Sequence, residues 1–289
     1  MNLPLKISEQ NVYQPQAGWE ALLQLNFVQK KSPHSTQTVM GKSHHYGPLR
    51  VQRLFYPEGD LAHVYILHPP GGVVGGDCLK VDFTIENNAQ VLSTTPGSGK
   101  FYLSAGDWAL LEQRMEIKSG ASLEWLPQEN ILFSGARLRA RTRIDCQDNA
   151  TFIGWDISCL GRPGSNEQFL DGAYDSRFEF YHNGTLLFVE NQRVFDKQTL
   201  HAIAGLRGNP IQATMLAFPC DHAHLETVRK YLETQNSELI AVTLIDGLLV
   251  VRALGQNSEK IKQQLTQIWQ VLRPVILKRF AVLPRIWAT

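Results

Sequence analysis

The sequence lacks paired cysteines and long apolar runs. Its four cysteines stand far apart, at positions 78, 146, 159 and 220, and form no CxxC pair. No apolar run approaches the roughly 20 residues of a membrane span. The first residues, Met1 to Lys6, lack the apolar core of a signal peptide. We therefore expect reduced thiols and a cytoplasmic protein without membrane contact.

The sequence also lacks an excess of either charge. It has 28 Lys and Arg against 27 Asp and Glu, which gives a formal net charge of +1. This balance gives no reason to expect nucleic acid as a partner. With 289 residues, of which 43% are hydrophobic, the chain can bury a substantial core. We expect a globular protein.

Glycine and proline gather in one stretch, HPPGGVVGGD at residues 68–77. The two prolines exclude a helix there, and the four glycines allow backbone conformations that a Cβ would forbid. After Asp77, apolar and polar residues alternate from Leu79 to Glu86, which predicts a strand. A second turn, TTPGSGK, follows at 94–100. So much glycine and proline beside a lone acid indicates a specific structural feature.

A short pattern recurs at the start of three predicted strands. A turn residue, an alanine, a polar residue and an apolar residue follow one another at 88–91, 120–123 and 149–152. The alanines at 89, 121 and 150 are 32 and 29 residues apart. A repeat near 30 residues favours stacked coils of strand, a β-solenoid-like layering. The alternative is that a turn followed by a strand recurs in any β protein.

The pattern changes after about residue 209. Asp221 is a candidate N-cap for one helix, and a second helix is predicted from about residue 257 to just before Pro274. We therefore predict a mainly β fold of stacked, β-helix-like sheets in residues 1–209. A small α+β portion with two α-helices, residues 210–289, packs on it. Residues 1–17 are expected to form a poorly ordered lead-in.

Four arginines alternate with apolar residues along one predicted strand. They are Arg137, Arg139, Arg141 and Arg143. The alternation places all four on one face of the strand. One interpretation is a solvated strand face. The other is a docking face for an acidic partner, because guanidinium groups pair well with carboxylates.

Several familiar motifs are incomplete. The GSGK at 97–100 lacks the earlier glycine and the later Ser or Thr of a phosphate loop, so nucleotide binding is not expected. Cys220, Asp221, His222 and His224 include metal-binding residue types. Helix capping by Asp221 is the simpler explanation of that cluster. A G-x-S-x-G nucleophile motif is absent from the sequence, and we predict no catalytic residues.

Carboxylates within apolar strands are more informative. Asp156 lies in FIGWDISCL, Glu190 ends LLFVE and Glu124 lies in LEWL, while Asp77 ends the glycine-rich turn. Burial of an acid without a partner is costly, so such residues pair with arginine, accept backbone hydrogen bonds or line a wet cavity. Several together would form a polar path for a hydrated divalent cation, because oxygen ligands release it readily. Ordinary buried hydrogen bonds or salt bridges are the alternative.

Five long motifs keep a fixed order along nearly the whole chain. They are HPPGGVVGGD at 68–77, TTPGSGKFY at 94–102, LEWLPQENILFSGA at 123–136, GWDISCLGRP at 154–163 and LRPVILKRFAVLPRIWAT at 272–289. Together they resemble the UreD family of urease accessory proteins, also named UreH. The resemblance implies a β-rich helical stack with two C-terminal α-helices.

The resemblance also implies a function. Family members are non-enzymatic scaffolds that dock on apo-urease and recruit UreF and, through it, the GTPase UreG. Together they load nickel from the metallochaperone UreE into urease, so Ni²⁺ is transient cargo and no cofactor is tightly bound. An internal tunnel is proposed to carry it, and motif position makes Asp77, Asp156 and Glu190 the tunnel candidates. Gly99 stands where relatives often have serine, which removes a hydroxyl from the proposed lining.

Two other functions stay open on the sequence. One is a pure adaptor that never touches metal. The other is a solenoid-like carbohydrate hydrolase or lyase that uses two of these acids. Glycosidase carboxylates lie about 5 to 10 Å apart across an open groove. Enclosure of the candidate acids would therefore count against the enzyme.

Overall fold

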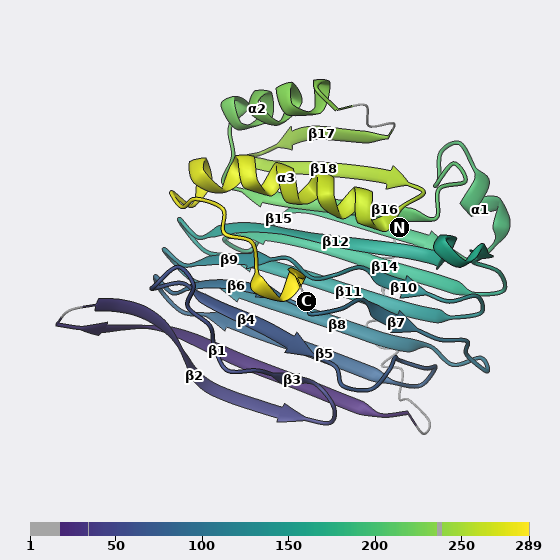
Figure 1. Cartoon of the computed structure of the whole chain (residues 1–289), viewed down its shortest axis with the longest axis horizontal. Helices are drawn as coiled ribbons and strands as arrows, with labels where there is room; N and C mark the ends of the chain where they lie inside the picture. Colours follow the sequence, from purple (N-terminus) through teal and green to yellow (C-terminus); the bar gives the residue numbers. More distant parts are fainter. Residues whose placement is uncertain (1–17, 34, 236–238, 289) are drawn as a thin grey trace, which may run out of the picture.

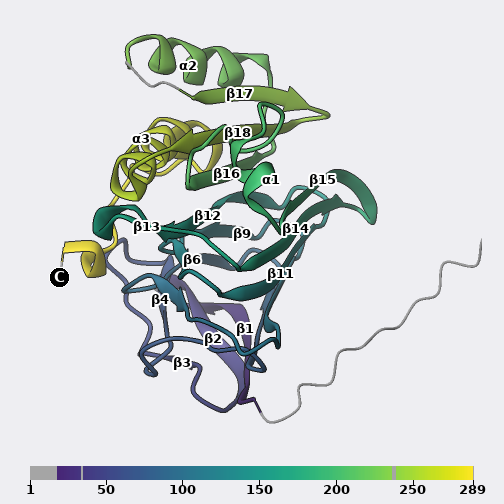
Figure 2. The ribbon, with the colours of Figure 1, turned by 90° about the vertical axis from the view of Figure 1, so that its right-hand side faces the viewer.

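Two β-sheets face each other, and helices cover the outer face of the larger sheet (Figure 1). The computed structural model describes residues 18–33, 35–235 and 239–288. Figure 2 looks along the strands and shows the two sheets and the helices as successive layers. The prediction of a mainly β, β-helix-like fold is confirmed. The predicted lead-in, residues 1–17, lies outside the described residues.

The smaller sheet has seven strands in the order β15-β14-β11-β8-β5-β1-β2. Their bounds are β1 Glu20–Ser32, β2 Ser35–Tyr46, β5 Cys78–Ile85, β8 Ala109–Ile117, β11 Arg137–Cys146, β14 Ala173–His182 and β15 Thr185–Val194. The run from β1 through β5, β8 and β11 to β14 is parallel, and β2 and β15 add antiparallel edges.

The larger sheet has eleven strands, of which eight follow the order β17-β18-β16-β12-β9-β6-β4-β3. Their bounds are β3 Arg50–Val51, β4 Ala62–Leu67, β6 Gln90–Thr94, β9 Ser122–Trp125, β12 Thr151–Arg162, β16 Ile211–Phe218, β17 Ile240–Ile245 and β18 Leu248–Gly255. The short strands β7 Gly99–Phe101, β10 Asn130–Leu132 and β13 Glu167–Gln168 pair beside β12 or each other.

The chain winds between the sheets as a solenoid. Strands β4, β6, β9 and β12 lie parallel in one sheet, and β5, β8, β11 and β14 follow them in the other. The repeated alanines mark the stacking, because the Ser122 amide donates to the carbonyl of Ala89 and the Thr151 amide donates to that of Ala121, each at 2.9 Å. The recurring pattern in the sequence therefore marks successive coils.

The C-terminal part continues the larger sheet. Strand β16 pairs antiparallel with β12, and β18 and β17 follow it. The predicted helices are present as α2, His222–Glu233, and α3, Ser258–Ile276, with Asp221 and Asn257 as N-caps. Shorter helical segments are α1 Lys197–His201, η1 Pro163–Ser165 and η2 Arg285–Ala288.

The predicted end of the second helix, just before Pro274, was wrong. Helix α3 continues past Pro274 to Ile276. Pro274 removes the amide that would bond to the Gln270 carbonyl, and its ring crowds that carbonyl. Gln270 lies on the exposed side of the helix, where its carbonyl can tilt toward water. Among the described residues, no helix is long and apolar enough to cross a membrane.

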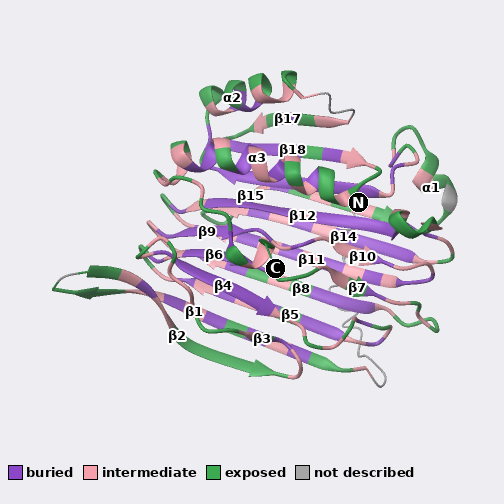
Figure 3. Cartoon of the chain, in the orientation of Figure 1, coloured by how far each residue is buried: buried purple, intermediate pink, exposed green. Residues whose placement is uncertain are grey.

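Buried residues run along the strands of both sheets (Figure 3). Their side chains form two cores, one between the sheets and one between the larger sheet and the helices. Strand β12 contributes to both, because its side chains alternate between the two faces. Phe152 and Leu160 belong to the core between the sheets, whereas Trp155 and Ile157 belong to the core under the helices. Asp156 shares the inter-sheet face of β12 with Phe152 and Leu160.

Candidate functional site

A polar layer interrupts the apolar core between the sheets. Strands β12, β14, β15 and β16 bring polar side chains around a cavity of about 10 Å³. Its lining consists of Asp156, Ser158, Ser176, Phe178, Glu190, Gln192, Gln212, Ala213 and Thr214. Such a volume holds about one water molecule. Two predicted site residues, Asp156 and Glu190, therefore line the same small cavity.

Asp156 also lines a second cavity. This cavity has a volume of about 300 Å³ and extends toward the glycine-rich turn, where His68 and residues 70–73 form part of its wall. Asp156 keeps some accessible surface because it faces both cavities, although protein surrounds it. It is thus the junction between the two spaces.

The pKa of the Asp156 carboxyl is raised. Burial, together with the charge of Glu190, raises its pKa to about 6, and a hydrogen bond from Asn130 opposes the rise. Burial disfavours the charged form because the protein interior solvates it poorly. A carboxyl of this kind is mostly ionised at neutral pH, but it gains more than a solvated one from a nearby cation.

Gly99 and Asn130 sit together in the wall of the 300 Å³ cavity. They are paired in register between β7 and β10, and a Cβ at Gly99 would lie 2.5 Å from Asn130 Oδ1. The Asn130 side chain therefore fills the space that a serine at position 99 would need. The side-chain amide of Asn130 therefore provides a polar group beside Gly99 in the cavity wall.

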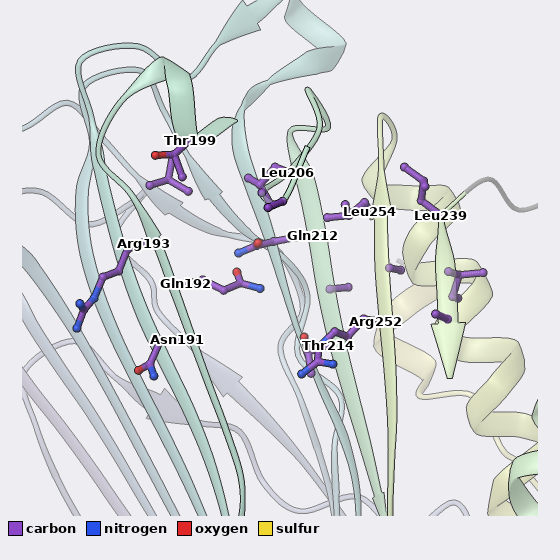
Figure 4. A pocket seen from close by; sticks show the side chains of 17 residues that line it. Asn191, Gln192, Arg193, Thr199, Leu206, Gln212, Thr214, Leu239, Arg252 and Leu254 are labelled. Carbon is purple, nitrogen blue, oxygen red and sulfur yellow. The ribbon is translucent and has the colours of Figure 1, made fainter. Parts of the chain in front are cut away.

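A third space adjoins the small cavity on its other side. It is a groove of about 640 Å³ between β15, the segment 199–206 and strands β17 and β18 (Figure 4). It shares four lining residues with the small cavity, namely Gln192, Gln212, Ala213 and Thr214. The small cavity thus adjoins both larger spaces, because it shares Asp156 with the cavity of about 300 Å³ and four residues with the groove.

Glu190 has two partners at the groove end of this series. The Thr214 hydroxyl donates to Glu190 Oε2 at 2.5 Å, and Arg252 Nε lies 2.6 Å from Glu190 Oε1. Thr214 and Arg252 face each other in the pairing of β16 with β18, which brings both to the same carboxylate. Glu190 is thus neutralised by an arginine, whereas Asp156 has the neutral Asn130 amide as its hydrogen-bond donor.

Asp77, the third candidate from the sequence, organises the glycine-rich turn. Its carboxylate accepts hydrogen bonds from the backbone amides of Trp19 at 2.9 Å and Val74 at 3.0 Å. Asp77 is not among the residues that line the two cavities or the groove. Its charge acts on His68, where it opposes the lowering of the histidine pKa by burial. The structure therefore brings Asp156 and Glu190 together and leaves Asp77 at the turn.

The four arginines of β11 share the outer face of the smaller sheet, as their alternation predicts. Acidic neighbours already contact them there. Arg139 and Arg141 lie 3.3 and 2.8 Å from Asp175, and Arg143 lies 2.7 Å from Asp145. Arg137 stacks over the ring of Trp108. Their docking role stays a prediction, on a face whose charges are largely paired within the chain.

The other sequence candidates have structural partners. Asp221 caps α2 in a reciprocal capping box with His224, as the simpler explanation of the Cys220–His224 cluster predicts. Glu124 is fully buried against Arg273 and Trp269. Among the described residues, no three His, Cys, Asp or Glu side chains are grouped so that they could hold a metal ion.

Sequence reasoning missed the neutral residues of the polar layer and its arginine. Gln212 and Thr214 are single polar residues within β16, and a single amide or hydroxyl carries no positional signal. His68 and Asn130 lie in motifs singled out above, so a search of those motifs for ligand-type side chains would have found them. Arg252 carried no such signal.

Comparison with known proteins identifies the family. A sequence model described as UreD urease accessory protein matches residues 20–288. A protein of Alcanivorax borkumensis named urease accessory protein UreD is 46% identical over 273 residues, which cover 94% of this chain and 93% of the relative. Its Pseudomonas putida counterpart is 43% identical over the full length of both chains, and that of Citrobacter koseri is 40% identical over 94% and 92%. The chain belongs to the UreD family of urease accessory proteins.

Proposed function

We propose that the chain is a urease maturation factor that conducts Ni²⁺ through its interior while bound to apo-urease, UreF and UreG. The observation that supports this is the series of adjoining spaces between the sheets, with Asp156 at a junction. In this proposal the protein acts in the cytoplasm, catalyses no reaction and holds no cofactor tightly. Nucleic acid and membranes are not among the proposed partners.

The side chains of the polar layer suit a passing cation. Carboxylate, hydroxyl and amide oxygens bind divalent ions, and they hold nickel less tightly than thiolates or clustered imidazoles. The cavity of about 10 Å³ is too small for a fully hydrated ion, so the ion exchanges water ligands for protein oxygens there. An ion beside Asp156 also offsets the unfavourable burial of that carboxylate.

Two alternatives give different expectations. A pure adaptor would position urease and the other accessory proteins without touching the metal. A carbohydrate-active enzyme would need its two acids across an open groove. The cavity that Asp156 and Glu190 share, of about 10 Å³, leaves no room for a sugar ring between them, which disfavours the enzyme.

The test is nickel loading in the assembled complex. Apo-urease is co-purified with this chain, UreF and UreG, supplied with Ni²⁺ and analysed for nickel per active site. We expect Asp156→Ala and Glu190→Ala to leave partner assembly intact and to lower nickel in urease. Asp156→Asn and Glu190→Gln repeat the test without a change of volume.

A matched control removes a solvent-facing acid. Asp82 lies on the outer face of the smaller sheet, where Gln24 donates to it at 3.1 Å. Asp82→Asn should leave nickel loading unchanged. Full loading by both Asp156→Ala and Glu190→Ala would remove the conduit and leave the adaptor. Failure of the wild-type chain to co-purify with any partner would remove both.

A further inference from the structure

One aspartate on the outer face of the smaller sheet contacts three arginines. Asp175 Oδ2 lies 3.3 Å from Arg139 Nε and 2.8 Å from Arg141 Nη2. Its Oδ1 lies 3.6 Å from the Nε of Arg193, whose side chain points away from the groove in Figure 4. Because one carboxylate balances one guanidinium, two of these three positive charges lack an acidic partner within the described chain.

Arg137 adds a fourth positive charge next to this group. It stands two residues before Arg139, on the same face of β11. In the part of the chain that the structure describes, Arg137 forms no hydrogen bond or ion pair, and its Nε is buried without an acceptor. Its guanidinium lies 5.1 Å from the centre of the Trp108 ring. No described carboxylate therefore balances the charge of Arg137.

Two aromatic rings lie beside these arginines. Trp108 precedes β8 and Phe195 follows β15, and their ring centroids are 6.3 Å apart in an edge-to-face arrangement. The Arg139 guanidinium also lies over the Trp108 ring, at 4.9 Å. Phe195 is 53% exposed. An exposed aromatic side chain among arginines is typical of the sites that contribute most to protein–protein binding.

Two other arginines of the same face are balanced. Arg143, further along β11, lies 2.7 Å from Asp145. Arg177 of β14 lies 2.5 Å from Glu179. The arginines without a carboxylate of their own instead gather where β11 and β14 begin and β15 ends. This end of the face therefore carries a local surplus of positive charge.

We propose that this end of the outer face is a docking site for an acidic segment of a partner protein. The site, which we call the arginine–aromatic patch, consists of Trp108, Arg137, Arg139, Arg193 and Phe195. Carboxylates of the segment pair with the guanidinium groups, and an apolar side chain beside them covers Phe195. Charge complementarity argues for an acidic occupant. The two guanidinium groups over Trp108 occupy ring surface on which a nucleobase would stack, which disfavours nucleic acid.

The inference goes beyond the proposed conduit. The arginine–aromatic patch lies on the outside of the smaller sheet, whereas Asp156 and Glu190 line a cavity between the sheets. The docking site therefore holds whether or not Ni²⁺ passes through the interior. It also narrows the docking face predicted from the sequence, because Arg143 lies outside the patch.

The charges of the patch are tested with a labelled peptide of four glutamates around one leucine. Fluorescence anisotropy measures its binding to the full chain. We expect Arg137→Gln/Arg193→Gln to weaken binding at least about tenfold, because it removes two charges that no carboxylate of their own balances. The matched control Arg143→Gln/Arg177→Gln removes the same net charge from balanced pairs and should weaken binding less than about threefold. Added salt should weaken binding by the wild type.

The apolar part of the patch is tested with Phe195→Ala. This variant should weaken binding of the leucine-containing peptide about fivefold, because the leucine loses the ring that it covers. Binding of a peptide of four glutamates without leucine should not change. Equal effects on the two peptides would remove Phe195 from the site.

Three outcomes would overturn the docking site. One is equal weakening by the two double variants, because the attraction would then belong to the whole face. Another is failure of the wild type to bind the leucine-containing peptide. The third is binding of phosphatidylserine vesicles or single-stranded RNA without binding of that peptide. Thermal unfolding checks that each variant is folded, and Arg193→Glu, at a 65% exposed side chain, repeats the test without a change at Arg137.

Discussion

The Arg273 guanidinium on α3 donates hydrogen bonds to both carboxylate oxygens of Glu124 on β9, although the two residues are 149 positions apart. Its Nε lies 2.8 Å from Oε2, and its Nη2 lies 3.0 Å from Oε1. Neither side chain has solvent exposure. The same guanidinium contacts Glu58, which in turn contacts His63. This network joins the C-terminal helix to the solenoid coils.

Removal of Arg273 should be strongly destabilising. Arg273→Ala leaves Glu124 in the interior without its positive partner, although the Trp269 indole still donates to it, and we expect the free energy of unfolding to decrease by about 3 to 5 kcal/mol. The exposed pair of Arg229 with Glu226 is the control, and Arg229→Ala should cost less than about 1 kcal/mol. Urea unfolding measures both, and similar losses in the two variants would contradict the prediction. Arg273→Met/Glu124→Leu should recover much of the loss.

Asp156 should make stability depend on pH. Its folded-state pKa of about 6 exceeds the ordinary 3.8, so its contribution to stability is fully present below pH 3.8 and is lost as pH rises through 6. Asp156→Asn should therefore be more stable than the wild type at pH 8, by at most about 3 kcal/mol, with little difference at pH 4. Urea unfolding at both pH values checks this. A pH-independent difference would show that the asparagine acts through packing, and Asp82→Asn serves as the control.

Nickel delivery should decrease on acidification through pH 6. Protonation of Asp156 removes the negative charge that a cation needs at the junction of the two cavities. We expect nickel per urease active site, measured in the assembled complex, to be lower at pH 5.5 than at pH 7.5. Because the other components also titrate, the comparison is with Asp156→Asn. A variant that shows the same fall as the wild type would place the titrating group elsewhere.

Gly99→Ser should displace Asn130. The added Cβ would lie 2.5 Å from Asn130 Oδ1, and overpacking of this kind costs about 1 to 3 kcal/mol. In the background Asn130→Ala, the same serine should cost clearly less, because the amide is gone. A double-mutant cycle by thermal unfolding measures this coupling. Additive effects of the two substitutions would mean that position 99 tolerates a side chain without movement of Asn130.

The solenoid was predictable because its physics is local and repeated. Alternation of apolar residues in the strand after Asp77 and in the arginine-rich strand follows from the pleat, and the stacked alanines follow from the coil length. The caps Asp221 and Asn257 mark the two helices for the same local reason. These features need no knowledge of distant contacts.

The candidate site was predictable only in its acids. A carboxylate within an apolar strand is conspicuous in the sequence, so Asp156 and Glu190 were found. Asp77 instead stabilises a turn, where its carboxylate accepts hydrogen bonds from two backbone amides. The partners Arg252 and Asn130 come from strands far away in the sequence. Their convergence depends on which strands become neighbours, and the pattern within one strand carries no such information.

The position of Asp156 in the middle of β12 also bears on how an ion would move. Strand β12 pairs with β16 at Asp156, and it pairs with β9 before this position and with β10 after it, so its backbone has little freedom to shift. Movement of an ion past Asp156 would then depend on rotation of side chains and exchange of water. These motions take picoseconds to nanoseconds where groups are loosely held. In the proposed conduit, the rate of transfer would then depend on a few side-chain rotamers and not on the bending of a domain.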